Sequence, residues 1–355
     1  MHQTANRLSA GEPLALKEMS PSSFGLVMAT GIVALAASMM GHPRLGTALF
    51  LWNVAQYAAL WVLYVLRAWR YPGRVLGDVV SHRLGPGYFT VVAATGVLSS
   101  QFVLQAQLPR VGLVLWALAI VLWIGLTYAI FAAFTVKPVK PTLDKGINGG
   151  WLLSVVATQS VVVCSVLLVP YIQPSHRPAL IFAALSMWLW GGMQYVWTMS
   201  LIFYRYTFFP LSPADLEPPY WINMGAMAIS TLAGSLLIEN AADVPFLATM
   251  LPFLEGFTLF YWAAGTWWIP MLLLLGAWRY LWNRFPLRYD PLYWGAVFPV
   301  GMYAACTWQL GHAMEFGFLS AVALAFLYAG LAAWSVVFCA MATTLSARYL
   351  GQRKG

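Results

Sequence analysis

The segment "WGAVFPVG", residues 294–301, places a phenylalanine directly before a proline and between two glycines. Pro299 removes the helical hydrogen bond to the carbonyl of Gly295 and kinks the helix. Gly295 and Gly301 flank the kink and loosen the chain further. Phe298 therefore lies on a bent helix and could point at the axis of a helix bundle, where its ring would close a pore. The alternative is a core aromatic residue that packs between helices.

An aromatic residue followed seven positions later by a small residue recurs in five apolar stretches, 24–38, 89–103, 151–165, 221–235 and 294–308. We call this the aromatic-to-small frame and count positions from the aromatic residue. Position 7 holds Gly31, Gly96, Thr158, Ala228 and Gly301. Position 4, on nearly the same helix face, holds Met28, Ala93, Val155, Gly225 and Phe298.

Small residues let helices approach closely in lipid, and an internal repeat indicates repeated structural units. The frame therefore predicts five helical hairpins, with the framed helices forming an inner ring that lines a pore. Chance agreement is the alternative, because glycine and alanine are common in this chain.

Hydroxyl and amide side chains in these stretches could bind a passing anion weakly. The candidates are Thr30, Thr95, Ser99, Thr158, Asn223, Ser230 and Thr231. The interiors of the stretches carry almost no ionisable residue, and conduction needs binding weak enough to release the ion. For each serine and threonine, the alternative is a hydrogen bond to its own helix backbone.

Four acidic residues, Glu239, Asp243, Glu255 and Glu315, lie on the outer side of the predicted spans. His312 is close to Glu315 in sequence, and this pair is the best candidate for coupling transport to protons. The alternative is a solvated pair in a loop.

The sequence lacks the patterns that a membrane enzyme or a metal site would need. It contains no Asp-rich diphosphate motif, no H-E-x-x-H motif and no two histidines at mid-membrane depth. Cys164, Cys306 and Cys339 lie in apolar stretches without zinc or disulfide spacing. We therefore predict no catalytic residue, metal or cofactor. A receptor or scaffold, the other alternative, would be expected to carry a soluble output region.

Apolar helices must position all these residues. Of the 355 residues, 61% are hydrophobic and 8% are charged, whereas soluble domains carry about 25% charged residues. The composition predicts an all-α membrane protein with ten transmembrane helices, at roughly 23–40, 46–67, 87–107, 111–134, 150–170, 178–204, 221–238, 249–277, 292–312 and 318–345. The frame assigns the odd-numbered spans to the inner ring. The even-numbered spans, with Leu272 in the eighth, are expected to face outward.

The distribution of lysine and arginine predicts the orientation. If the N-terminus is cytoplasmic, the inner segments hold 16 of these residues and the outer loops hold three, Arg44, Arg110 and Arg177. The expected organisation is a cytoplasmic segment 1–20, a ten-helix domain 21–346 and a cytoplasmic tail 347–355 in the cell membrane. Topology thus accounts for most of the net charge of +8, so nucleic acid is not an expected partner.

Four stretches resemble helices of the tellurite-resistance/dicarboxylate transporter family. The stretch "FGLVMATGIVALAA" is similar to the first helix of the family, and "INGGWLLSVVATQS", "PPYWINMGAMAIS" and "WGAVFPVGMYAACT" are similar to the fifth, seventh and ninth. The resemblance covers nearly the whole chain. One departure is Ala29, where the family usually has glycine.

The family includes plant slow anion channels, the fungal malate permease, the fungal sulfite exporter and bacterial tellurite-resistance proteins. The resemblance implies a homotrimer with one pore per subunit and five hairpins in a quasi-fivefold array. It also implies that a phenylalanine of the ninth helix, here Phe298, closes the pore. The implied substrates are small anions, either inorganic anions or C4-dicarboxylates. A passive channel and a proton-coupled carrier both fit the sequence.

Overall fold

The computed structural model describes residues 14–352, and every regular element in that range is helical. Five helices begin within two residues of the aromatic residue of a frame: α2 (Gly25–Met39), α5 (Phe89–Leu104), α8 (Leu153–Leu168), α10 (Ile222–Glu239) and α13 (Trp294–Ala313). We call these the inner helices. Five longer outer helices alternate with them: α3 (Pro43–Arg70), α6 (Pro109–Val136), α9 (Arg177–Phe208), α12 (Leu251–Ala277) and α14 (Leu319–Gln352).

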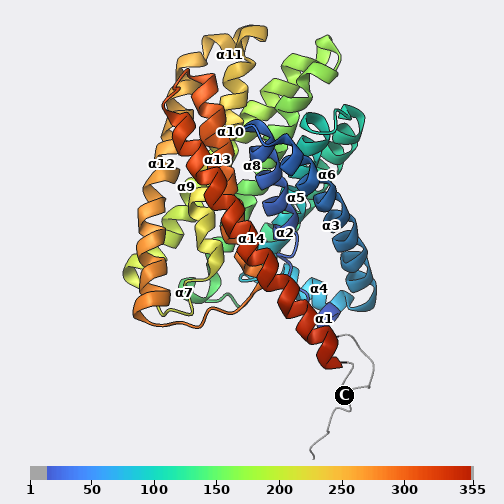
Figure 1. Cartoon of the computed structure of the whole chain (residues 1–355), viewed down its shortest axis with the longest axis vertical. Helices are drawn as coiled ribbons and strands as arrows, with labels where there is room; N and C mark the ends of the chain where they lie inside the picture. Colours follow the sequence, from blue (N-terminus) through green and yellow to red (C-terminus); the bar gives the residue numbers. More distant parts are fainter. Residues whose placement is uncertain (1–13, 353–355) are drawn as a thin grey trace, which may run out of the picture.

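Short helical elements connect the long helices at both ends of the molecule. Four short elements follow an outer helix or precede an inner helix: α1 (Leu14–Lys17), α4 (Pro72–Val79), α7 (Leu143–Gly146) and the π-helical η7 (Trp278–Trp282). Those after the inner helices are η3 (Val169–Tyr171), η4 (Pro174–His176), η6 (Ala241–Asp243) and α11 (Pro245–Thr249). Figure 1 shows α1, α4 and α7 at the end near the C-terminus and α11 at the opposite end.

The inner helices form a closed ring of neighbours. Contacts run from α2 to α5, to α8, to α10, to α13 and back to α2. In the most apolar window of α8 and of α10, 94% of residues are buried, against 17% for α6 and α14. Apolar side chains such as Val114 and Val336 cover the exposed faces of the outer helices, and exposed apolar surface of this extent indicates contact with lipid. The five framed stretches are thus the five most enclosed helices.

Eight described helices are long and apolar enough to cross a membrane. The prediction of an all-α membrane protein is confirmed at this level. The remaining two of the ten predicted spans correspond to α2, which is apolar but has 15 residues, and to α13, which has 20 residues and is not among the eight. That these two cross the membrane stays a prediction. Residues 1–13 and 353–355, which belong to the predicted terminal segments, lie outside the described residues.

The expectation that Leu272 faces outward is wrong. Leu272 is 3% exposed, and it lies on the same face of α12 as the buried Tyr261, Gly265 and Trp268. These residues are spaced by four, three and four positions, which places them on one stripe of a helix. That stripe packs against α10, so an outer helix has a buried face as well as a lipid face.

Four inner helices are preceded by a 3₁₀ turn: η1 (Gly85–Tyr88), η2 (Gly149–Leu152), η5 (Pro218–Trp221) and η8 (Pro291–Tyr293). The turns contact each other in order around the ring, and η8 contacts α2. A Cβ atom added to Gly149 would lie 2.6 Å from the backbone nitrogen of Tyr220. The backbones of neighbouring turns therefore pack directly against one another at this end of the ring.

Candidate functional site

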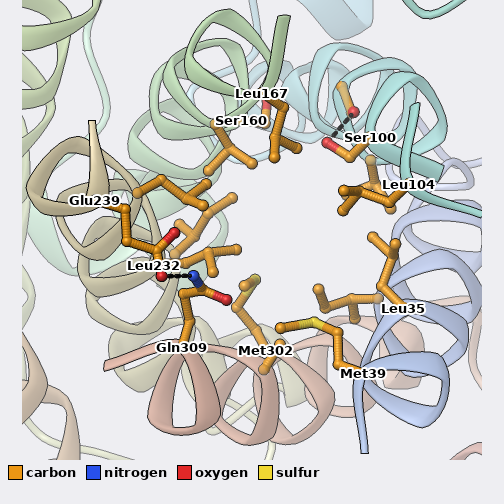
Figure 2. Close-up of a pocket in the computed structure, with 17 residues that line it drawn as sticks. Leu35, Met39, Ser100, Leu104, Ser160, Leu167, Leu232, Glu239, Met302 and Gln309 are labelled. Atoms are coloured by element: carbon orange, nitrogen blue, oxygen red, sulfur yellow. Dashed lines mark hydrogen bonds between the residues drawn. The ribbon is translucent and has the colours of Figure 1, made fainter. Parts of the chain in front are cut away.

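A cavity of about 260 Å³ lies inside the ring, and all its lining residues belong to the five inner helices. We call it the central cavity. Figure 2 shows the labelled side chains converging on this space from every side. The lining is mostly apolar, with Ser100, Ser160, Gln309 and Glu239 as its polar side chains.

The lining residues occupy matching positions of the aromatic-to-small frame. In α2, α5, α10 and α13 they recur at positions 8, 11 and 15, and in α8 each comes one position later. The set is Ile32, Leu35 and Met39; Val97, Ser100 and Leu104; Ser160, Val163 and Leu167; Ile229, Leu232 and Leu236; and Met302, Ala305 and Gln309. Steps of three and four residues follow one face of a helix. The five helices thus turn equivalent faces toward the same space.

Phe298 lies one helical turn before Met302 on the same face of α13. It is fully buried and does not line the central cavity. Four residues correspond to about 6 Å along a helix, so Phe298 lies beyond the end of the cavity marked by Met302. The neighbouring Pro299 packs closely on α10, because a Cβ atom added to Gly225 would lie 2.8 Å from Cγ of Pro299.

The other residues at position 4, Met28, Ala93, Val155 and Gly225, are buried at the same level of their helices. None of them lines the central cavity. If they line a pore, they do so at the level of Phe298 rather than in the central cavity. Their role as pore-lining residues stays a prediction.

The small residues at position 7 lie against neighbouring helices. A Cβ atom added to Gly96 would lie 2.9 Å from Ser160, and one added to Gly301 would lie 2.9 Å from Val33. Gly31 likewise faces Val97 and Asn53. Position 7 differs from the cavity-facing position 8 by about 100° around the helix. These glycines let the helices of the ring approach each other, and Gly96 also borders the cavity.

Three predicted anion donors bond instead to aromatic residues of the outer helices. Trp334 Nε1 donates to Thr30 Oγ1 at 2.9 Å, and Trp123 Nε1 donates to Thr158 Oγ1 at 2.8 Å. Tyr57 Oη and Thr95 Oγ1 are 2.9 Å apart. These hydroxyl groups therefore join the inner ring to the outer one, away from the central cavity.

The remaining predicted donors also avoid the central cavity. Ser230 and Thr231 donate to carbonyls of their own helix, as the alternative stated. Ser99 Oγ donates to the carbonyl of Gly112 on α6, and Asn223 Nδ2 lies 3.5 Å from Tyr206 Oη. Ala228, at position 7 of its frame, is buried and is not among the lining residues. The prediction missed Ser100 and Ser160, because the sequence gives no sign that their frame positions face the cavity.

The titratable residue in the central cavity is Glu239, the last residue of α10. Gln309 Nε2 donates to Glu239 Oε1 at 2.6 Å (Figure 2). His312 lies within electrostatic range of Glu239, and its Nδ1 is 2.8 Å from the carbonyl of Trp308. Glu315 follows the end of α13 at a φ of 56° and does not line the cavity. Of the predicted pair, His312 is thus the member near the cavity.

Positive charge gathers at the opposite end of the ring. Arg83, Lys137, Lys140 and Lys145 line a second cavity, of about 330 Å³, together with His82. The pKa of His82 is lowered chiefly by burial, and the charges of Lys137 and Lys140 add to the shift.

Three ion pairs hold the loops at the same end. Arg67 pairs with Asp78 at 2.6 Å, Arg205 with Asp215 at 3.5 Å, and Arg83 with Glu217. Partial burial raises the pKa of Asp215, but hydrogen bonds from Ser212 and the nearby positive charges of Arg205 and Arg83 outweigh it, so the net shift is downward. The carboxylate therefore stays ionised at neutral pH.

A family model described as a voltage-dependent anion channel matches residues 18–342, nearly the whole chain. The chain belongs to this family. The resemblance inferred from the four framed stretches is thereby confirmed, since the match contains all of them.

Similar proteins occur in bacteria and archaea. Two are described as uncharacterized transporters of Methanocaldococcus jannaschii: one is 25% identical over 93% of this chain and 92% of its own length, and the other is 24% identical over 82% and 84%. An uncharacterized membrane protein of Mycobacterium tuberculosis is 39% identical over 43% of this chain and 77% of its own length. The family description and the relatives point to transporters or channels, which are not enzymes.

No group of three or more His, Cys, Asp or Glu side chains that could hold a metal ion is found among the described residues. Two of the three cysteines, Cys164 and Cys306, are buried in inner helices, where they act as small packing residues.

Proposed function

We propose that this chain carries small anions across a membrane through the ring of inner helices. The observation that supports this most is the central cavity, which five equivalent helix faces line in a member of an anion-channel family. The arrangement that we propose has ten transmembrane helices as five hairpins in a quasi-fivefold array. The resemblance to the family adds a homotrimer in which each subunit has its own pore.

Phe298 is proposed to close this path next to the central cavity. It is fully buried, it lies one helical turn before the cavity-facing Met302, and Pro299 packs its helix against α10. At the same frame position, the other inner helices carry smaller side chains: Met28, Ala93, Val155 and Gly225. Phe298 therefore has the largest side chain at this level of the path.

The proposed path binds anions weakly. No lysine or arginine of residues 14–352 lines the central cavity, and a fixed cation there would hold an anion too tightly for conduction. Attraction comes instead from the basic end of the ring around Lys137, Lys140 and Lys145. The N-termini of the inner helices point to that end, and their partial positive charge favours anions.

The first test is ion selectivity in proteoliposomes. We expect chloride, nitrate, sulfite or malate to cross far faster than sodium or potassium, because the basic end of the ring repels cations. Flux of isotopically labelled ions measures this, with protein-free vesicles as the control. Selectivity for cations, or no flux under any gradient, would contradict the proposed function.

The second test is the orientation, which rests on the 16-to-3 distribution of basic residues. Reporter fusions after residues 75, 140 and 287 are expected to report the cytoplasm, and fusions after 110, 175 and 242 the outside. The charge bias sets this orientation during insertion. One reproducible inversion among the six fusions would disprove the ten-span arrangement with cytoplasmic termini.

A proton-coupled carrier is a second candidate, and the carboxylate of Glu239 in the central cavity favours it. Voltage clamp under anion substitution at two pH values separates the two. Currents that reverse at the anion equilibrium potential indicate a channel, and a reversal potential that follows pH indicates a coupled carrier.

A further inference from the structure

Glu239 occupies a place where an anion path would not be expected to carry negative charge. Among the described residues that line the central cavity, it is the one ionisable side chain. The lining around it, including Leu232 and Leu236 of the same helix, is apolar. A passing anion therefore meets this carboxylate without a neighbouring cation in the lining to offset it.

The surroundings hold Glu239 at the mouth of the cavity and leave it open to water. Gln309 on α13 donates the hydrogen bond at 2.6 Å, and the carboxylate is exposed. Figure 2 shows the two side chains together at the edge of the ring of lining residues. An exposed carboxylate exchanges protons freely with the bulk solution, and the amide donor fixes it beside the path.

Among the described side chains, His312 is the charged group that acts on this carboxylate. From α13 the relevant group is His312, which lies within electrostatic range. The following elements carry Asp243 in η6 and Glu255 in α12, whereas α8 has no charged residue and α9 has Arg177 and Arg205 near its two ends. His312 is therefore the group whose titration must be separated from that of Glu239.

We propose that Glu239 is a proton-binding site that controls the entry of anions into the central cavity. This proposal rests on the proposed anion path. The ionised carboxylate repels an anion, whereas the protonated carboxyl is neutral and presents an O–H donor to it. Protonation thus converts a barrier into a weak binding site, and acidification increases anion transport.

The size of the effect follows from Coulomb's law. One charge at 4 Å changes the energy of an anion by about 1 kcal/mol even in bulk water, which corresponds to about fivefold in rate. The apolar lining makes the local dielectric response weaker than that of water. We therefore expect at least about a fivefold change in anion flux on protonation.

The test measures chloride flux at symmetrical pH 4 and 7.5, because a glutamate carboxyl is mostly protonated at the first pH and ionised at the second. Symmetrical pH also makes the orientation of the protein in the vesicle irrelevant. The parent with Glu239 intact is expected to conduct at least about fivefold faster at the lower pH. Glu239→Gln keeps the shape of the side chain and an acceptor for Gln309. We expect its flux to be high at both pH values, and Glu239→Ala serves as a second neutral variant.

Two controls isolate the carboxylate. Glu315→Gln removes another acidic residue on the same side that does not line the cavity, and His312→Asn removes the nearby histidine. Both variants are expected to keep the acid response of the parent, and Glu239→Asp is expected to keep it as well.

The outcomes separate this proposal from the function on which it rests. Anion flux that ignores pH in the parent, or that still responds to acid in both neutral variants of Glu239, would overturn the role of Glu239 alone. Loss of the acid response in His312→Asn would transfer the role to the histidine. Absence of anion flux from every variant would overturn the anion path itself.

Discussion

Replacement of Phe298 by alanine is expected to raise anion flux by about tenfold or more, because each ~1.4 kcal/mol removed from a barrier is tenfold in rate. The reason is steric: the ring lies by register one turn beyond the central cavity, on the helix face that lines it. The measurement is anion flux or current per folded protein at the membrane, compared with the unsubstituted chain.

A matched control is available in Phe24→Ala. Phe24 is also fully buried and opens the frame of α2, but its ring makes edge contacts with Tyr57, Trp61 and Tyr64 of the outer helix α3. Both substitutions remove a buried ring at a cost of about 3–5 kcal/mol. Only Phe298→Ala is expected to increase flux. A folded Phe298→Ala variant that conducts like the unsubstituted chain would show that Phe298 is a packing residue.

The sequence predicts which helices are enclosed because enclosure leaves a compositional record. Helices that touch neighbours on all sides need small residues for close approach, and Gly96 and Gly301 mark this requirement in α5 and α13. The outer helices need bulk and apolarity toward lipid, which gives them their tryptophan and leucine. The alternation of small-residue inner helices with bulky, apolar outer helices is therefore visible in the sequence.

The sequence does not reveal which face of an inner helix meets the cavity. Positions 7 and 8 of the frame are adjacent in the chain, yet they point about 100° apart. The small residue at position 7 marks contact with a neighbour, so it draws attention to the wrong face. Ile32, Val97 and Met302, at position 8, are ordinary apolar residues without any distinguishing signal.

The partners of the polar residues depend on packing across the two rings. Thr30 and Thr158 meet tryptophans of α14 and α6, far away in sequence. The pairing of His312 with Glu315 followed from their closeness in the chain, but the chain turns at Glu315 with a positive φ. Glu239, three positions beyond the cavity-facing Leu236, continues the spacing of the lining residues and could be placed once that spacing was known.

A cysteine at position 236 is expected to make anion flux sensitive to a thiol reagent if the central cavity and Phe298 lie in series on one path. Leu236 lines the cavity and retains 8% exposure, whereas the adjacent Leu237 is fully buried and does not line it. The test uses Phe298→Ala as the parent and adds Leu236→Cys or Leu237→Cys. A negatively charged methanethiosulfonate would then place a bulky anion in the cavity.

We expect this reagent to reduce flux through the variant with Leu236→Cys by about tenfold or more, because the adduct adds both volume and one negative charge to a narrow, mostly apolar space. Flux through the Leu237→Cys variant and through the parent, which retains the native cysteines, is expected to change little. Mass spectrometry confirms that the thiol at position 236 has reacted. If the cysteine is labelled and flux persists, anions do not pass through the central cavity, and the high conductance of Phe298→Ala would have to arise along another route.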